Sequence, residues 1–320
     1  MTPVLLDCDP GHDDAVALLY AAAHMRLAGL TTVHGNQTVD HTTRNALSLC
    51  RLAGLDIPVA RGADRPLVAE PITGGAIHGA TGLDGAELPE PDRAPEPGHA
   101  VDLILRLAHA HRGELVLAAT GALTNVALAL KVEPSLRDWL HGITLMGGSA
   151  SIGNTTPVAE FNIVCDPEAA DIVFRSGCRL WMVGLDVTRR VGVDAAGIAW
   201  LREGGGSVAR TIADLLDFFL QSLNRVHGLS TASLHDPCAL VPFIAPELME
   251  YRDTHVQVEL ASPVTRGMTV CDLRRLSPVP LGSIRAGQPA NVLLAREPAP
   301  GLVKHILDAV RLVDRRISHP

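Results

Sequence analysis

The run from Val4 to Ala15, Val-Leu-Leu-Asp-Cys-Asp-Pro-Gly-His-Asp-Asp-Ala, decides how this chain folds. Its apolar start predicts a buried β-strand, and the apolar residues 16–23 that follow predict a helix. The acidic turn between them, residues 7–14, contains four carboxylates. Like charges crowded at one strand end repel one another unless a cation or hydrogen-bond donors compensate them. Helix capping uses one or two acids, so we favour a metal or polar-ligand site over capping alone.

The composition indicates a large buried core. Hydrophobic residues make up 47% of the 320 residues and charged residues 19%, which argues against disorder. Aromatic residues are only 3% of the chain, so the core must consist mostly of Leu, Val, Ala and Ile, as in a parallel sheet buried on both faces. Neither an internal repeat nor a hydrophilic linker divides the sequence, and we expect one domain over residues 1–320.

Charge and cysteine content exclude several classes of partner. The net charge of −8 and the lack of a basic run argue against a nucleic-acid partner. The six cysteines form no CxxC pair, so we expect reduced thiols and a cytoplasmic protein. The N-terminus begins in a strand without a signal segment, and no apolar run approaches the roughly 20 residues of a membrane span.

Strands alternate with helices along the chain. We expect strands at 4–6, 27–33, 57–60, 115–119, 143–146, 179–183 and 291–295, and helices at 16–23, 39–52, 100–111, 124–131 and 302–316. Further helices are expected after Asp166-Pro167, with Pro167 at the first helical position, after His235-Asp236-Pro237, and on both sides of Gly204-Gly205-Gly206. This alternation predicts an α/β fold with an open, mostly parallel, Rossmann-like sheet flanked by helices. Residues 254–260 and 267–272 predict a small antiparallel edge.

Residues 61–98 break this alternation, because they are rich in Gly and Pro and show little periodicity. A loop of this length inside a compact chain is usually functional or disordered. We expect residues 74–85 within it to form a mobile lid.

The residues singled out where predicted strands end are mostly polar. Asp9, Asn36, Thr120, Met146 and Asp186 all occupy such positions, and open α/β sheets bind ligands outside the carboxyl ends of their strands. The acids offer hard oxygen donors without the Cys or His spacing of a zinc site. A calcium or magnesium ion is therefore indicated, and calcium accepts carbonyls and bidentate carboxylates more readily.

Two further groups of polar residues point to a ligand. Asn154, Glu160 and Asn162 provide closely spaced donors and acceptors that suit a polyhydroxylated ligand such as a sugar. His235 directly precedes Asp236, which would place a proton donor beside a metal-bound carboxylate. Taken alone, Asp236 is better explained as a helix N-cap before Pro237.

The run from Asp7 to Ala15 resembles the N-terminal signature of the inosine–uridine-preferring nucleoside hydrolases. The likeness continues in order through residues 31–36, 77–79, 120–125, 145–148, 159–162, 166–170, 184–188, 235–237 and 266–270. It therefore covers nearly the whole chain.

This resemblance implies a calcium-dependent hydrolysis of the N-glycosidic bond of ribonucleosides, as used in purine and pyrimidine salvage, through an oxocarbenium-like transition state. The implied calcium ligands are Asp9, Asp14, the carbonyl of Thr120, and Asp236. The implied substrate contacts are Asp13, Asn36, His78, Met146, Asn154, Glu160, Phe161 and Asn162. Asp9 would be the base that activates the calcium-bound water, and His235 the acid that protonates the leaving base. The resemblance also implies a homo-oligomer, a tetramer or a dimer.

The sequence departs from the family pattern before His235. Where relatives often place a tyrosine that reaches the base, this chain has Leu223, Asn224 and His227. The run Gly82-Leu83-Asp84-Gly85 resembles a loop of pyrimidine-leaning members. The sequence does not rank purine against pyrimidine nucleosides.

Two alternatives from other functional classes were weighed. A magnesium-dependent Asp-x-Asp phosphohydrolase would use Asp7 as its nucleophile, but Pro10-Gly11-His12 follows and lysines are nearly absent. A non-catalytic, calcium-dependent ribose- or nucleoside-binding protein would keep the calcium and sugar ligands without an acid and a base. The presence of Asp9 and His235 argues against it. Release of free ribose from nucleosides, as opposed to phosphate from a phosphomonoester, separates these readings.

Overall fold

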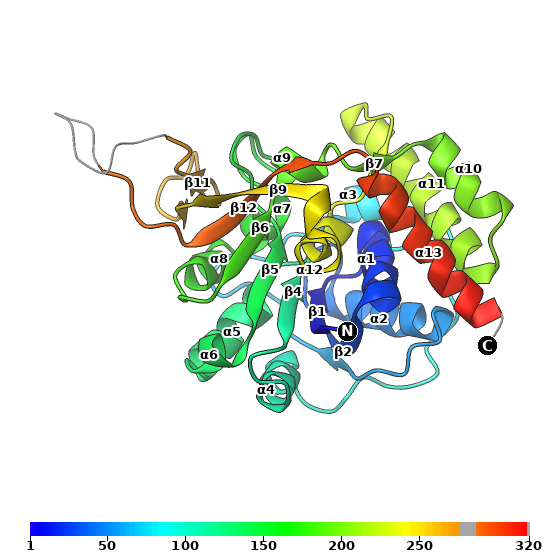
Figure 1. Ribbon diagram of the computed structural model, residues 1–320, viewed down its shortest axis with the longest axis horizontal. Coiled ribbons are helices and arrows are strands. Elements are labelled where there is room, and N and C mark those ends of the chain that lie inside the picture. Colours follow the sequence, from blue (N-terminus) through cyan, green and yellow to red (C-terminus); the bar gives the residue numbers. More distant parts are fainter. Residues whose placement is uncertain (275–285, 319–320) are drawn as a thin grey trace.

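An eight-stranded β-sheet forms the centre of the computed structural model, which describes residues 1–274 and 286–318 (Figure 1). Its strand order is β3-β2-β1-β4-β5-β6-β12-β9, and all neighbours are parallel except β12 and β9. The strands are β1 (Pro3–Cys8), β2 (Arg26–Thr32), β3 (Val59–Arg61), β4 (Val116–Ala119), β5 (Gly142–Met146), β6 (Leu180–Val183), β9 (Met249–Thr254) and β12 (Val292–Pro298). The predicted mostly parallel α/β sheet is confirmed.

Side chains of β1 alternate between two hydrophobic cores. Val4 and Leu6 belong to one core, and Leu5 belongs to the core on the other face. All three are fully buried, as expected when helices cover both faces of a parallel sheet.

Helices from distant parts of the sequence cover the two faces. Figure 1 shows α1 and α13 on one side of the sheet and α5 and α8 on the other. The first core is closed by α1 (His12–His24), α2 (Val39–Leu52), α11 (Ser207–His227) and α13 (Leu302–Ser318), with α10 (Ala195–Glu203) packed on α11. The second core is closed by α4 (Ala100–Ala110), α5 (Thr124–Val132), α6 (Leu136–Trp139) and α8 (Pro167–Phe174). The predicted bounds of α2 are confirmed, as is Pro167 in the first turn of α8 with Asp166 as its cap.

The antiparallel elements differ in part from the prediction. Strands β10 (Val256–Val258) and β11 (Thr269–Cys271) pair antiparallel, as predicted, but they form a separate two-stranded sheet. The antiparallel edge of the main sheet is β9, which was not predicted. Its burial pattern mixes buried and exposed positions without strict alternation, so the period-two signal is weak. A further pair joins β7 (Gly192–Val193) to β8 (Ala232–Ser233).

The interpretation of Asp236 as a helix N-cap is wrong. Asp236 is the first residue of η1 (Asp236–Leu240), a 3₁₀-helix, and His235 precedes it without a side-chain cap. The chain continues into α12 (Val241–Ile244) and η2 (Pro246–Leu248). The carboxylate of Asp236 is thus available for another purpose.

Four short helices escaped the sequence prediction because four or five residues are too few to show a helical period. They are α3 (Gly75–His78), α6, α7 (Phe161–Cys165) and α9 (Leu185–Thr188). All six cysteines lie in the described part of the chain and are unpaired there, and five of them are buried. Of the helices described, none combines the length and apolar character needed to cross a membrane.

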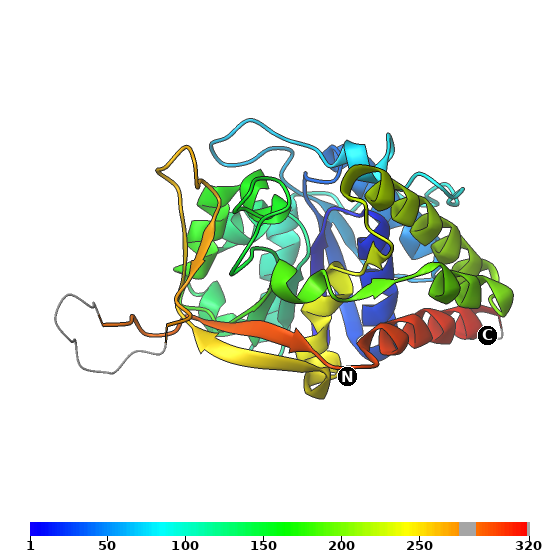
Figure 2. The ribbon, with the colours of Figure 1, turned by 90° about the horizontal axis from the view of Figure 1, so that it is seen from above.

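Residues 74–85, expected as a mobile lid, are anchored to the rest of the molecule. Helix α3 packs against α11, as Figure 2 shows from above. The side chain of Gln37 donates to the carbonyl of Gly79 at 2.9 Å, and that of Asn45 donates to the carbonyl of Thr81 at 2.9 Å. These contacts make the segment a wall built onto α2 and α11.

Asn125 holds three segments together beneath the carboxyl edge of the sheet. Its Nδ2 donates to Asp7 Oδ1 at 2.8 Å and to the Thr32 carbonyl at 3.0 Å, and its Oδ1 accepts from the Ala63 N–H at 2.9 Å. We expect Asn125→Ala to lower the free energy of unfolding by about 2–4 kcal/mol, because it leaves buried groups without partners. Urea denaturation checks this, with the exposed Lys131→Ala on the same helix as control. Equal urea midpoints for the two variants would contradict the prediction.

Candidate functional site

The central strands end at one level, which brings the residues after them together. In the pairing register Cys8 lies opposite Thr32, Asp7 opposite Ala119, and Ala119 opposite Leu145. The residues that follow these strands therefore meet at the carboxyl edge. The register therefore brings the residues singled out after these strands to the same edge of the sheet.

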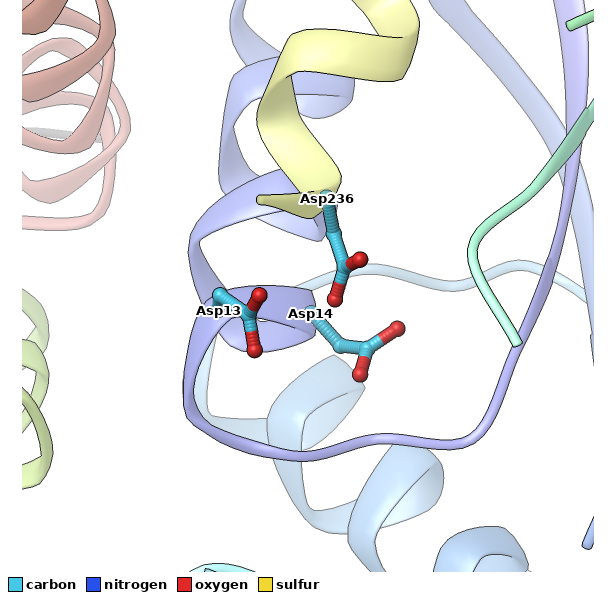
Figure 3. A group of neighbouring side chains, drawn as sticks. All are labelled: Asp13, Asp14 and Asp236. Atoms are coloured by element: carbon cyan, nitrogen blue, oxygen red, sulfur yellow. The ribbon is translucent and has the colours of Figure 1, made fainter. Parts of the chain in front are cut away.

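Three carboxylates converge at this edge. Asp13 and Asp14 come from the first turn of α1 and Asp236 from η1, and one oxygen from each lies within 4.8 Å of the others. Figure 3 shows Asp236 reaching down toward the two acids of α1. The acidic turn and the segment around residue 236 thus form one site, although more than two hundred residues separate them in the sequence.

Asp9 lies beside this group without belonging to it. Its Oδ2 accepts from the backbone N–H of Asn36 at 2.6 Å, while its Oδ1 is buried and has no partner among the described residues. A Cβ at Gly35 would lie 2.0 Å from Oδ2, and one at Gly121 would lie 2.6 Å from Oδ1. Only glycine therefore lets the chain close around this carboxylate. The structure groups Asp13, and not Asp9, with Asp14 and Asp236.

Burial makes ionisation of these acids unfavourable. It raises the pKa of Asp13 to about 7 and that of Asp14 to about 6. Burial also raises the pKa of Asp9 and Asp236 well above the usual range, and the charges of the neighbouring acids add to it. A cation would reverse this balance. Buried, oxygen-only donors with one unpartnered carboxylate oxygen fit a hard divalent cation.

Backbone and amide groups complete the floor of the site. The hydroxyl of Thr120 donates to Asp14 Oδ1 at 2.7 Å, and Asn36 Nδ2 donates to Asp14 Oδ2 at 3.3 Å. The side chain of Asn162 donates to the carbonyls of Thr120 and Met146 at 2.8 and 3.0 Å. A carbonyl oxygen has two lone pairs, so the Thr120 carbonyl keeps one for a further partner.

A pocket of about 680 Å³, which includes its open mouth, lies above the acids. Its lining combines polar side chains with apolar and aromatic ones. The polar lining residues are Asp13, Asn36, Thr120, Asn154, Thr155, Glu160, Asn162, His235 and Asp236. The remaining lining residues are Gly74, Ile77, His78, Met146, Phe161, Phe219, Leu223 and His227. The size and mixed lining suit a small ligand with a hydroxyl-rich part and a flat apolar part.

Glu160 also has a structural role that was not predicted, because it caps α7. Its Oε1 accepts from the Asn162 N–H at 2.9 Å, and its Oε2 accepts from the N–H groups of Gly148 and Ile163 at 2.9 and 3.2 Å. Asn154 holds the same helix from the other side, since its Oδ1 accepts from the Phe161 N–H at 2.9 Å. The loop between β5 and α7 is therefore shaped by the residues that line the pocket.

His235 is half-buried, and among the described residues its ring is held by Thr188. Its Nδ1 lies 2.7 Å from the hydroxyl of Thr188, which places its other nitrogen on the pocket side. Burial, together with the smaller effect of the nearby Arg189 charge, lowers the pKa of His235 to about 4. Asp186, which the sequence also singled out, follows strand β6. Its carboxylate accepts hydrogen bonds from the Ala150 N–H and the Ser151 hydroxyl, so it shapes a loop outside the pocket.

Most of the residues singled out from the sequence meet in this pocket. Of the thirteen named metal, substrate and catalytic residues, all but Asp9 and Asp14 line it, and those two lie buried behind it. Phe219 and Thr155 were missed. Phe219 and Leu223 lie four residues apart on α11, so they share a face, but the sequence does not distinguish a face that lines a pocket from one that packs in the core.

A site of this kind defines a class of protein: enzymes of α/β fold that hold a metal ion beside a small polar ligand. The comparisons with known proteins name the family. The family profile "Inosine-uridine preferring nucleoside hydrolase" matches residues 4–299. The chain belongs to this family and is a ribonucleoside hydrolase. Membership of this family favours the nucleoside hydrolase over the two alternatives, the Asp-x-Asp phosphohydrolase and the non-catalytic binding protein.

Relatives of both substrate preferences are similar to this chain. A pyrimidine-specific ribonucleoside hydrolase of Enterobacter sp. is 46% identical over 279 residues, 86% of this chain and 89% of that protein. One from Shewanella baltica is 44% identical over 317 residues, 97% of this chain and 96% of that protein. The solved structure of a purine-preferring ribonucleoside hydrolase from Gardnerella vaginalis superposes with a TM-score of 0.89 at 30% identity, covering 98% of this chain and 99% of that one.

Glu160 makes the stability of the protein depend on pH. Burial raises the pKa of its carboxyl from 4.5 to about 7, although backbone N–H groups favour the charged form. The folded state keeps this proton where the unfolded chain has released it. Its contribution is therefore fully present below pH 4.5 and is lost as the pH rises to about 7. The full change amounts to about 3 kcal/mol.

We expect the free energy of unfolding of the wild type to fall by about 3 kcal/mol relative to Glu160→Gln between pH 4.5 and pH 8. The altered cap of α7 in the variant adds an offset that does not depend on pH. Urea denaturation at several pH values measures the difference. A difference that stays constant over this range would contradict the prediction.

Proposed function

We propose that this ribonucleoside hydrolase acts on pyrimidine ribonucleosides and uses a calcium ion at the carboxylate cluster. The observation that carries the proposal is the position of the pocket. Two of the three converging carboxylates, Asp13 and Asp236, line it together with amide, apolar and aromatic side chains. The polar residues suit the hydroxyl groups of a ribose, and the apolar and aromatic residues suit a planar base.

The preference for pyrimidines is supported by the relatives. Those 44–46% identical to this chain are named pyrimidine-specific, whereas the purine-preferring structure shares 30% identity.

The proposed calcium ligands are Asp9, Asp14, the carbonyl of Thr120, and Asp236. Calcium is favoured because the donors are carboxylates and a carbonyl, which calcium accepts in irregular geometry. Asp13 lines the pocket and is proposed for the ribose hydroxyls, although its carboxylate also lies within reach of Asp14 and Asp236. When bound, the ion would supply a positive charge that makes water a stronger acid.

The acids and amides of the pocket act on the ribose. Asp9 is the proposed general base, since its Oδ1 is free of described partners and its Oδ2 is held by Asn36. It would accept the proton of the attacking water. Positive charge develops on the ribose as the glycosidic bond breaks, and Asp13, Glu160 and the amide oxygens around it stabilise that charge.

His235 is the proposed acid for the leaving base. Burial lowers its pKa, which opposes protonation in the free protein. Negative charge that develops on the departing base acts in the opposite direction, because a nearby anion favours the imidazolium. Thr188 holds the ring through Nδ1, which directs Nε2 at the pocket. Met146, Phe161 and His78 would contact the sugar and the base.

Three wider features belong to the proposal. Residues 1–320 would act as a single domain, because one sheet takes strands from Pro3 to Pro298. A cytoplasmic location is supported by the six unpaired cysteines. A homo-oligomer, a dimer or a tetramer, is expected from the family resemblance and is measured by sedimentation.

A nucleoside panel tests the reaction and its preference. Release of reducing sugar from uridine, cytidine, inosine and guanosine is measured beside phosphate release from a phosphomonoester. We expect ribose from uridine and cytidine with a kcat/KM at least about tenfold above that of the purines, a difference of about 1.4 kcal/mol in transition-state binding. Equal or greater activity with purines would overturn the preference, and phosphate release without ribose would overturn the reaction.

The carboxylates are tested by stability as well as activity. In chelator-treated protein, Asp236→Asn should raise the melting temperature, because it removes repulsion from Asp13 and Asp14. The same variant should lose the rise in melting temperature that calcium gives the wild type. The exposed Asp64→Asn is the control and should behave like the wild type.

Asp13→Ala and Asp236→Ala should both lose turnover, by at least about a hundredfold, while circular dichroism shows a folded protein. If either variant keeps near-wild-type turnover, the assignment of these residues is wrong. If calcium stabilises Asp236→Asn as much as the wild type, the ion does not bind at this cluster.

A further inference from the structure

His12 is the residue of the acidic turn to which the proposed function gives no role. It is the first residue of α1, and its side chain is fully buried. Its Nε2 lies 2.8 Å from the carbonyl oxygen of Asp84, and its Nδ1 lies 3.0 Å from Nδ1 of His78. Because His78 lines the pocket, His12 connects the loop at Asp84 to the pocket wall.

These partners decide which nitrogen of each ring carries a proton. A carbonyl oxygen only accepts, so Nε2 of His12 donates to Asp84. The ring stacks on Phe218 and Phe219, with centroids 5.4 and 5.2 Å away, and no described carboxylate bonds to it, so it is a neutral imidazole. Its Nδ1 therefore has a lone pair, and the proton in the contact between the two rings belongs to Nδ1 of His78.

A second donor competes for Nδ1 of His78. The backbone N–H of His12 lies 3.5 Å from it, beyond the usual length of such a hydrogen bond. If this N–H used the lone pair of His78, the ring of His12 would have to donate from both nitrogens and would be a buried cation. The shorter contact between the rings, 3.0 Å, avoids that cost.

The surrounding backbone holds both rings in place. A Cβ at Gly11 would lie 2.6 Å from His78 Nδ1, so the close approach of the rings requires glycine there. The carboxylate of Asp84 accepts from the N–H groups of Ala80 and Thr81 at 2.9 and 3.0 Å. These bonds fix the loop whose carbonyl orients His12.

The other nitrogen of His78 is open to the pocket. Both hydrogen-bonding contacts of the His78 ring, to the N–H and to the ring of His12, involve Nδ1, and no described residue hydrogen-bonds to Nε2. This atom is not among the fully buried polar atoms without a partner, and His78 lines the pocket. We propose that His12 is a positioning residue that holds His78 in the Nδ1–H tautomer, so that His78 Nε2 accepts a hydrogen bond from an N–H group of the base. The identity of the ligand rests on the proposed function, whereas the tautomer does not.

This tautomer selects a chemical class of base. Lactam bases such as uracil offer a ring N–H to an acceptor, and replacing that hydrogen by a methyl group removes the interaction. In this tautomer His78 offers no proton to the pocket. The leaving base must then be protonated by another group, in line with the role proposed for His235.

Nitrogen-15 NMR of the histidine-labelled full chain tests the tautomer, with the His78 signals assigned by their loss in His78→Asn. We expect a protonated Nδ1 and an unprotonated Nε2 in the wild type. His12→Asn places an amide oxygen near the position of the His12 Nδ1 and should keep this pattern. His12→Phe keeps the stacking but removes the acceptor, so His78 should lose the pattern. An Nε2–H tautomer or a cationic His78 in the wild type at neutral pH would overturn the proposal.

Kinetics with uridine and N3-methyluridine test the consequence for the base. The ratio of their kcat/KM values should fall by about five- to tenfold in His12→Phe relative to the wild type and to His12→Asn. Any steric effect of the methyl group is common to all variants. His24→Phe, the same change at the other end of α1, should leave the ratio unchanged. An unchanged ratio in His12→Phe would overturn the selection of an N–H donor.

The two experiments separate this inference from the proposed function. If no nucleoside releases ribose, the proposed function fails, and the NMR result still decides whether His12 sets the tautomer. If ribose is released and His78 has the other tautomer, the proposed function stands and this inference fails.

Discussion

The burial of several carboxylates beside one another is the constraint on which the rest of this structure depends. Like charges in a low-dielectric environment repel strongly, and each also loses its hydration. Hydrogen-bond donors from separate segments of the chain stabilise these carboxylates. Asp14 accepts from the Gly11 N–H and the Thr120 hydroxyl, and Asp9 accepts from the Asn36 N–H. These groups meet only because β1, β2 and β4 are neighbours in the sheet and end at the same level.

The same neighbours that stabilise the acids also shape the pocket. Asn162 joins the ends of β4 and β5 through two carbonyls, and Glu160 caps the helix that presents Asn162. A residue that contacts a ligand here therefore also holds backbone. Substitutions at the site are therefore expected to change stability as well as activity, so the two have to be measured separately. His12 also has two roles, because its buried ring stacks on Phe219 and orients His78.

Periodicity located the long elements because their signals extend over several turns or over a whole buried strand. Helix α2 and strand β1 are clear cases. Short elements such as α7 and η1 carry no such signal, because a single turn shows no period. Asp236 illustrates the consequence. An acid before a proline has the local chemistry of a helix cap, and only the packing of η1 against α1 shows that it faces Asp13 and Asp14.

The sequence by itself determined the fold class, the acidic turn and the edge of the sheet at which the polar residues gather, because hydrophobic alternation and strand-end chemistry are local properties. Eleven of the thirteen residues that were named from the sequence line one pocket. Only the tertiary structure decided which acids converge, that Asp9 is buried with one oxygen that has no partner among the described residues, and that Phe219 forms part of the wall. Those facts depend on distances between segments far apart in the chain. Such distances are set by strand order and helix packing, and no local pattern of residues encodes them.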